Sequence, residues 1–232
     1  MGRIIAGILC QLIIVSTVNA QSHISLGGGY NQSIYYCGLP KSTYYTTFRP
    51  YDSYLVNISY KKDVAVERNN MRIGAQCEWK RQSAYFYYED RRNGDTIPSG
   101  IRYDLNIIQL YVFPELVVGN PIRFVFSGGP CMEYIVSSKA KGIRLIDDER
   151  TEMEETNNGD IRGLYVGAKI SIGMEFPVYK DFYISVYNAY SAGLSSKYGR
   201  LQKQMKYFNC LDINLYATLC YRFTPNNKTI NK

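Results

Sequence analysis

Apolar and polar side chains alternate along much of the chain, most regularly between residues 163 and 177. One set of alternate positions is entirely apolar: Leu164, Val166, Ala168, Ile170, Ile172, Met174 and Phe176. The other set is polar or small: Tyr165, Gly167, Lys169, Ser171, Gly173 and Glu175. Successive side chains of a strand point to opposite faces, so this pattern predicts a two-faced β-strand. The run is long enough to cross a membrane, which takes about 9–11 residues in a tilted strand.

The same alternation recurs in seven further segments. The eight predicted strands cover residues 22–36, 53–60, 71–88, 100–117, 122–136, 160–176, 182–193 and 208–223. Long connections follow the odd-numbered strands, at residues 37–52, 89–99, 137–159 and 194–206, whereas those after the fourth and sixth strands are only a few residues. A charged connection at 61–70 is intermediate in length. Short turns at one end and long loops at the other are typical of outer-membrane barrels. We therefore expect an all-β, eight-stranded antiparallel transmembrane up-and-down barrel with periplasmic termini.

The N-terminal segment indicates export. Arg3 precedes a mostly apolar run from Ile4 to Val18, and small residues then lead to Ala20. This layout predicts a cleaved signal peptide at residues 1–20, followed by the barrel at 21–223 and a short polar tail at 224–232. No later stretch is apolar enough for a spanning helix, so a membrane location requires a closed barrel.

Composition and charge narrow the function classes. Hydrophobic residues make up 46% of the chain, and 23 tyrosines suit strands and membrane interfaces. Without residues 1–20 the chain carries 26 basic and 20 acidic side chains, a net charge of +6. An exported barrel with this mild charge is expected to meet anionic lipid, with lipopolysaccharide as a partner, and no nucleic acid.

Three groups of segments resemble the outer-membrane β-barrel family that includes the PorT-like proteins. They are residues 107–120 (IIQLYVFPELVVGN) with 121–130 (PIRFVFSGGP) and 134–139, the hairpin of 163–176 and 182–194, and the closing strand 215–223. The resemblance implies an outer-membrane barrel with a Gly-Pro bend near residue 130. It implies no activity, because members of the family are functionally diverse. Phe223 departs from the family pattern because nine residues follow it.

Charged residues on the predicted inward face form the main candidate site. These are Arg72, Glu78, Lys80, Arg102, Asp104, Glu133, Lys169, Glu175, Asp212 and Arg222. An eight-stranded barrel is just wide enough for side chains to fill, so we expect five positive and five negative charges to pair in a closed lumen. A second candidate site lies near the predicted external interface, where Lys139, Lys141 and Arg144 are placed to contact lipopolysaccharide phosphates.

No pattern predicts catalysis, a cofactor or a metal. The single histidine, His23, lies at the periplasmic end of the first strand, away from the external loops. The acidic run 147–155 lacks the ordered spacing of a calcium loop, and no CxxC pair exists. Five cysteines follow the signal peptide, and the sequence does not assign their pairing: Cys37, Cys77, Cys131, Cys210 and Cys220.

The sequence thus favours a small, non-catalytic outer-membrane barrel with a structural or surface-binding role. Two alternatives remain open at this point. One is a PorT-like accessory component of a secretion or surface-assembly machinery, with envelope proteins as partners. The other is a soluble exported barrel that holds a small ligand, in which the apolar face of each strand would point inward.

Overall fold

The computed structural model describes residues 21–38, 45–50, 52–66, 69–92, 95–146, 149–156, 164–194 and 207–223. The predicted signal peptide at 1–20 and the polar tail at 224–232 lie outside these residues. Almost every described residue belongs to a β-strand. Among the described residues, no helix has the length and apolar character needed to cross a membrane.

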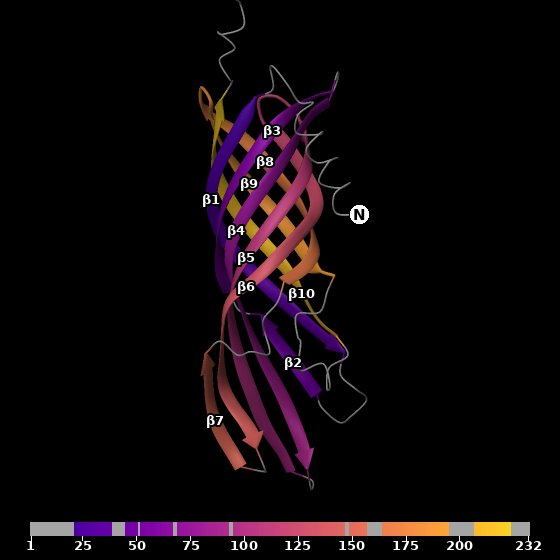
Figure 1. The fold of residues 1–232 in the computed structure, drawn as a ribbon, viewed down its shortest axis with the longest axis vertical. Helices are drawn as coiled ribbons and strands as arrows, with labels where there is room; N and C mark the ends of the chain where they lie inside the picture. The colour runs from indigo at the N-terminus through magenta and orange to yellow at the C-terminus, as the bar shows by residue number, and fades with distance from the viewer. Residues whose placement is uncertain are drawn as a thin grey trace, which may run out of the picture.

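Eight antiparallel strands close into a barrel (Figure 1). They are β1 (Ser22–Gly38), β3 (Asp52–Val66), β4 (Asn69–Arg92), β5 (Asp95–Val118), β6 (Arg123–Ile146), β8 (Leu164–Tyr179), β9 (Phe182–Gly193) and β10 (Tyr207–Phe223). Each strand pairs with its neighbours around the barrel, and β1 pairs with β10 along its whole length. This order confirms the predicted eight-stranded antiparallel up-and-down barrel.

The seam between β1 and β10 is closely packed. Ser22 lies opposite Phe223 at one end and Gly38 opposite Tyr207 at the other. A Cβ atom on Gly29 would lie 2.2 Å from the Leu215 carbonyl oxygen, so only glycine allows this approach. The first and last strands of the barrel are therefore paired in close contact over the whole length of β1.

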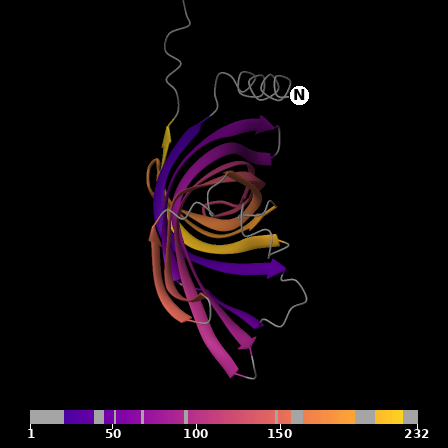
Figure 2. The same ribbon diagram turned by 60° about the horizontal axis from the view of Figure 1, so that its bottom comes forward.

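Beyond the barrel, three strands continue as an open sheet. β4, β5 and β6 each contain 24 residues, and two short strands border them. β2 (Tyr45–Pro50) pairs with β4, and β7 (Glu149–Thr156) pairs with β6. The resulting five-stranded projection, in the order β2-β4-β5-β6-β7, lies below the barrel in Figure 1 and comes toward the viewer in Figure 2.

The projection corrects the predicted loops. Residues 37–52, 89–99 and 137–159 were expected to be loops, but they contain β2, the ends of β4, β5 and β6, and β7. The predicted loop 194–206 lies almost entirely outside the described residues. The sheet of the projection is not closed into a barrel. Its two faces therefore do not need opposite polarity, and its sequence does not need to alternate between apolar and polar residues. Residues such as 149–156 (ERTEMEET) therefore carry no strand signal of the kind that identified the barrel.

The opposite end of the barrel has short connections. β3 continues to Val66 and β4 begins at Asn69, so the charged segment 61–70 is mostly strand and not the turn that the sequence suggested. Lys61 extends the inward series that starts at Asn57 and Ser59. Between β5 and β6, Gly119 has a φ of 112°, a conformation that glycine adopts without strain. Short turns therefore gather at this end, and the sheet extends from the other.

The two faces of the barrel wall differ sharply in polarity. On β8 the side chain of Ile170 is 57% exposed, whereas that of the preceding residue, Lys169, is fully buried. Apolar side chains form an outward belt that includes Ile24, Leu26, Val56, Ile58, Ile73, Trp79, Ile108, Leu110, Val112, Phe124, Phe126, Met132, Leu164, Val166, Ile170, Ile172, Ile184, Leu215 and Leu219. This distribution is the reverse of that expected for a soluble barrel with an apolar ligand cavity.

β5 has the opposite phase to the one predicted for its first half. Leu105 and Ile107 are buried inside the barrel, and Asp104 lies on the outward face with Ile108. The predictions that Arg102 and Asp104 line the lumen are therefore wrong. Because Ile107 and Ile108 are both apolar, the sequence does not show which of the two faces the lumen. Pairing with β4 sets the phase, because Glu78 lies opposite Gln109 and Arg72 opposite Glu115.

Candidate functional site

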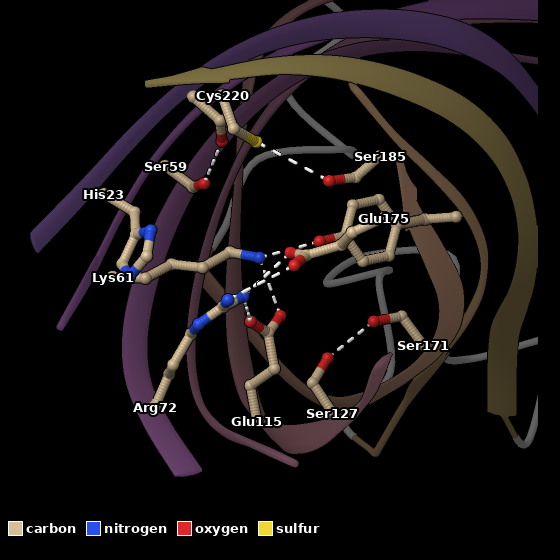
Figure 3. Close-up of polar contacts among 12 residues, drawn as sticks. His23, Ser59, Lys61, Arg72, Glu115, Ser127, Ser171, Glu175, Ser185 and Cys220 are labelled. Atoms are coloured by element: carbon tan, nitrogen blue, oxygen red, sulfur yellow. Dashed lines mark hydrogen bonds and ion pairs between the residues drawn. The ribbon is translucent and has the colours of Figure 1, made fainter. Parts of the chain in front are cut away.

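A group of charged side chains fills the lumen near the short turns. We call it the Arg72 cluster: Lys61, Asp63, Arg72, Glu115 and Glu175. The Arg72 guanidinium contacts Glu175 at 2.7 Å and Glu115 at 3.0 Å, and the Lys61 ammonium contacts Glu115 at 2.7 Å. Figure 3 shows these side chains converging from different strands. Each buried charge thus has a partner of opposite sign, as a low-dielectric interior requires.

Two further contacts extend the Arg72 cluster toward the barrel end. Arg123 Nη2 lies 3.0 Å from Glu175 Oε2, and its side chain is 21% exposed. On the other side, Asp63 lies 2.9 Å from His23 Nε2, and Tyr183 Oη lies 2.9 Å from His23 Nδ1. Both ring nitrogens of this buried histidine are therefore engaged. Its partners make His23 part of the packing at this end of the lumen.

An aromatic layer lies next to the Arg72 cluster, on the side away from the short turns. It consists of two stacked pairs, Tyr111 with Phe113 at 4.5 Å and Tyr187 with Tyr216 at 5.2 Å between ring centroids. Inward glycines make room for these rings. A Cβ on Gly74 would lie 2.6 Å from the Phe113 ring. Lysines cover the layer from both sides, with Lys61 Nζ 5.0 Å from the Tyr187 ring centroid and Lys169 Nζ 5.4 Å from that of Tyr111.

A second charged group, the Lys80 cluster, lies on the far side of the aromatic layer. It comprises Glu78, Lys80, Glu133, Lys169 and Asp212. Lys80 Nζ contacts Glu133 at 2.7 Å and Asp212 at 2.5 Å, and Lys169 Nζ contacts Glu78 at 2.8 Å. Neutral amides complete the group, because Gln109 Nε2 donates to Glu133 and Gln82 Nε2 donates to Asp212. The Arg72 cluster, the aromatic layer and the Lys80 cluster thus follow one another along the barrel axis.

A small cavity remains between the layers. It measures about 10 Å³, room for about one water molecule. Its lining includes Asn57, Ser59, Gln76 and Thr218. Both polar side-chain atoms of Asn57 are buried and have no hydrogen-bond partner among the described residues. A cavity of this size suits a water molecule and is too small for passage of larger solutes.

A third charged group lies on the outer wall, just beyond the apolar belt. We call it the rim patch: Arg81, Ser83, Arg102, Asp104 and Lys139. Arg81 Nη2 lies 3.3 Å from Asp104 Oδ2, and Arg102 Nε lies 3.2 Å from Asp104 Oδ1. The Ser83 hydroxyl donates to Asp104, and Lys139 is the register partner of Asp104 on β6. One carboxylate therefore holds two guanidiniums beside an exposed lysine.

The structure distributes the ten charges predicted for the lumen among three places. Seven are in the two lumen clusters: Arg72, Glu78, Lys80, Glu133, Lys169, Glu175 and Asp212. Arg102 and Asp104 are in the rim patch. Arg222 lies at the short-turn end, where its Nε is 3.6 Å from Asp181, and its side chain is 33% exposed.

The three residues predicted to meet lipopolysaccharide all lie on β6. Lys139 and Lys141 are exposed, and Lys141 Nζ is 3.5 Å from Glu154 on β7. Arg144 lies farther along β6, opposite Thr151, and its side chain is outside the described residues.

Sequence reasoning missed several members of these sites. The charged segment 61–70 suggests a turn, which hides Lys61 and Asp63, and Glu115 lies in β5, where the sequence does not show which face points inward. A usable signal was present for Lys61 and Asp63, because they continue the alternation of Asn57 and Ser59. No comparable signal existed for Arg81, which directly follows Lys80 in a charged pair.

The cysteines and acids form no further site in the part of the chain that the structure describes. Cys77, Cys131 and Cys220 are free thiols, the Cys210 thiol donates to Asp212 Oδ1 at 3.2 Å, and the side chain of Cys37 is outside the described residues. No group of three or more described His, Cys, Asp or Glu residues is arranged to hold a metal. The acidic run 147–155 begins outside the described residues and continues in β7.

Neither a protein-family model nor a curated protein sequence matches the chain. Similar solved structures include the attachment invasion locus protein Ail of Yersinia pestis, in complex with the heparin analogue sucrose octasulfate. Ail is 16% identical, with a TM-score of 0.41 over 89% of this chain and 100% of that chain. Neisserial surface protein A is 8% identical, with a TM-score of 0.41 over 85% and 96%. The outer membrane protease OmpT of Escherichia coli is 11% identical, with a TM-score of 0.43 over 88% and 97%.

The identities and scores are low, so the fold assignment rests on the strand order and side-chain distribution of the chain itself. None of these three structures is named as PorT-like.

Proposed function

We propose that the chain is a small outer-membrane β-barrel with a structural or surface-binding role, no catalytic activity and a lumen closed to solutes. The observation that carries the proposal is the inverted polarity of the wall, with an apolar belt outside and paired charges inside. Only a lipid environment makes such a belt favourable around a closed barrel. On β5 the belt spans residues 108–118, which matches the roughly 9–11 residues needed to cross a bilayer.

The paired charges and stacked rings across the lumen support a barrel that is not a diffusion pore. Two charge clusters and an aromatic layer cross the barrel in series, and opening it would separate buried ion pairs. Breaking one such pair costs about 3–5 kcal/mol. We therefore infer that the function of the protein resides in its outer surface and its projection.

Ile170→Lys tests the membrane location. Ile170 is 57% exposed in the middle of the belt on β8, and a lysine there costs about 2–4 kcal/mol if it faces hydrocarbon. We expect the variant to be lost from the outer-membrane fraction and to lose the mobility difference between boiled and unboiled samples. Val178→Lys is the matched control on the same strand, because Val178 is 59% exposed at the short-turn end of β8, two residues before Lys180, and the cost there is about 0–1 kcal/mol.

Normal recovery of Ile170→Lys in the outer membrane would contradict the proposal. So would release of the unaltered protein into the soluble periplasmic fraction.

The projection supports a second candidate function, an accessory role in a secretion or surface-assembly machinery of the PorT-like kind. Its five strands present a sheet beyond the barrel, bordered by the short strands β2 and β7. A sheet that extends from a membrane barrel offers an area for envelope protein partners. Purification from native outer membrane tests this role, with envelope proteins retained on the full chain and lost when β2 and β7 are replaced by flexible linkers.

A further inference from the structure

The rim patch combines three positive charges with one carboxylate on a single outward face. Arg81, Arg102 and Lys139 come from the adjacent strands β4, β5 and β6, and Asp104 lies among them. The four side chains carry a net charge of +2. The exposed fractions of the Arg81 and Arg102 side chains are 38% and 42%, so both guanidiniums reach solvent while the carboxylate orients them. A guanidinium carries five N–H donors, and one contact with Asp104 leaves Arg81 with donors for a second acceptor.

The position of the patch relative to the belt identifies the kind of ligand. Trp79 lies two residues before Arg81 on the same face of β4 and packs against Tyr54 on β3 at 5.5 Å between ring centroids. Tryptophan and tyrosine favour the boundary between hydrocarbon and headgroups. The patch therefore lies at headgroup depth. On the side of the patch toward the short turns, Ile108, Leu110 and Val136 continue the apolar surface on β5 and β6.

A ligand that fits both the rim patch and the apolar belt has an anionic head at the level of the arginines and acyl chains along the belt. The patch lies at the end of the barrel opposite the short turns, so in the proposed orientation it faces the outer leaflet. Two guanidiniums and an ammonium side by side suit a phosphate, which accepts several charge-assisted hydrogen bonds.

We propose that the rim patch binds a phosphate of a phosphorylated outer-leaflet glycolipid of the lipid A class, with the acyl chains of that lipid on the belt of β4, β5 and β6. This inference rests on the proposed function. It replaces Arg144 by Arg81 and Arg102 among the residues expected to contact lipopolysaccharide. Lys141, whose ammonium pairs with Glu154, is assigned a lesser part.

The chain provides its own reporter for binding. Trp79 is the single tryptophan, and it lies directly beside the patch. Purified full-length protein, folded in detergent, is titrated with bisphosphorylated lipid A while the Trp79 fluorescence is followed. We expect a saturable change with bisphosphorylated lipid A, and weaker binding of lipid A without phosphate and of phosphatidylglycerol.

The triple variant Arg81→Gln, Arg102→Gln, Lys139→Gln should bind lipid A about tenfold more weakly or worse, since it loses several charge-assisted contacts. Lys62→Gln is the matched control. It removes one positive charge from the same outward face at the short-turn end of β3, where Lys62 lies opposite Ile73, and binding should be unchanged. If the triple variant does not fold, Arg81→Gln with Lys139→Gln replaces it, because the pair Arg102–Asp104 is then retained.

Equal affinity of the triple variant and the unaltered protein would overturn the assignment. Equal binding of phosphate-free lipid A would show that the acyl chains alone are recognised, and equal binding of phosphatidylglycerol would show that only negative charge is recognised; both results also contradict it. The measurement uses purified protein, whereas the membrane location is read by fractionation of Ile170→Lys. Failure of the lipid A proposal is therefore distinguishable from failure of the proposed membrane location.

Discussion

Arginine and carboxylate meet in two regions of this barrel, under different conditions. In the Arg72 cluster, Arg72 and Glu175 are almost completely buried, and every charge is held by a second or third partner. In the rim patch, Arg81 and Arg102 share Asp104 and remain well exposed. The buried arrangement uses the charges to fill and close the lumen. The exposed arrangement leaves positive charge facing the surroundings, so the same pair of residue types serves packing in one region and recognition in the other.

The difference between the regions should be greatest when a carboxylate is removed. We expect Glu175→Ala to lower the free energy of unfolding by about 3–5 kcal/mol, because it leaves buried positive charge without its partner. Urea unfolding of the barrel in vesicles, followed by the loss of its unboiled gel mobility, measures this change. A loss below about 1 kcal/mol would mean that the cluster is solvated in the way that exposed ion pairs are.

The aromatic layer allows a test of whether the lumen is packed as tightly as a protein core. A Cβ on Gly173 would lie 2.5 Å from Tyr187 Cδ1 and 2.7 Å from the Val186 carbonyl oxygen. We expect Gly173→Ala to destabilise the barrel by about 1–3 kcal/mol through overpacking, measured in the same unfolding assay.

Gly128→Ala is the control for this substitution. The nearest atom to a Cβ there is Ile170 Cγ2 at 3.4 Å, which is an ordinary contact. Equal stability of the two variants would indicate a lumen loose enough to absorb a methyl group.

The smallest effect on stability is expected at the rim. Asp104→Asn should change the free energy of unfolding by less than about 1 kcal/mol, because ion pairs near the surface contribute little. Asp104→Asn should instead weaken lipid A binding, because the guanidiniums of Arg81 and Arg102 lose the carboxylate that orients them. A destabilisation as large as that of Glu175→Ala would show that Asp104 is a structural charge, and would remove the contrast between the two regions.

The sequence revealed those features that depend on alternation between lipid and lumen. β8 is the clearest case, since each residue from Leu164 to Glu175 lies on the side that its polarity predicts. In β5 the same reasoning failed, because Leu105 and Ile107 fill the lumen while Ile108 faces outward. The lumen of this barrel holds both apolar and charged side chains. The polarity of a residue therefore does not always show whether it faces the lumen or the outside.

The candidate sites were predictable only in part for a related reason. Lys80, Lys169 and Asp212 lie in strands with regular alternation, so their inward direction could be read. Their pairing could not, because it joins strands far apart in sequence, such as Lys80 with Asp212. The rim patch depends on the register between β4, β5 and β6, which the sequence does not specify.

The seam between β1 and β10 has a consequence for the order in which the molecule can form. β1 leaves the ribosome first, yet one of its two neighbours is the last strand of the barrel to be made. Until β10 arrives, β1 has an unpaired edge that could join another chain. Contacts between such distant segments form slowly, because a long loop must close before they are gained. If the chain is exported as proposed, it therefore needs protection from aggregation, by a chaperone that holds it or by immediate delivery to an insertion machinery, until β1 and β10 can meet.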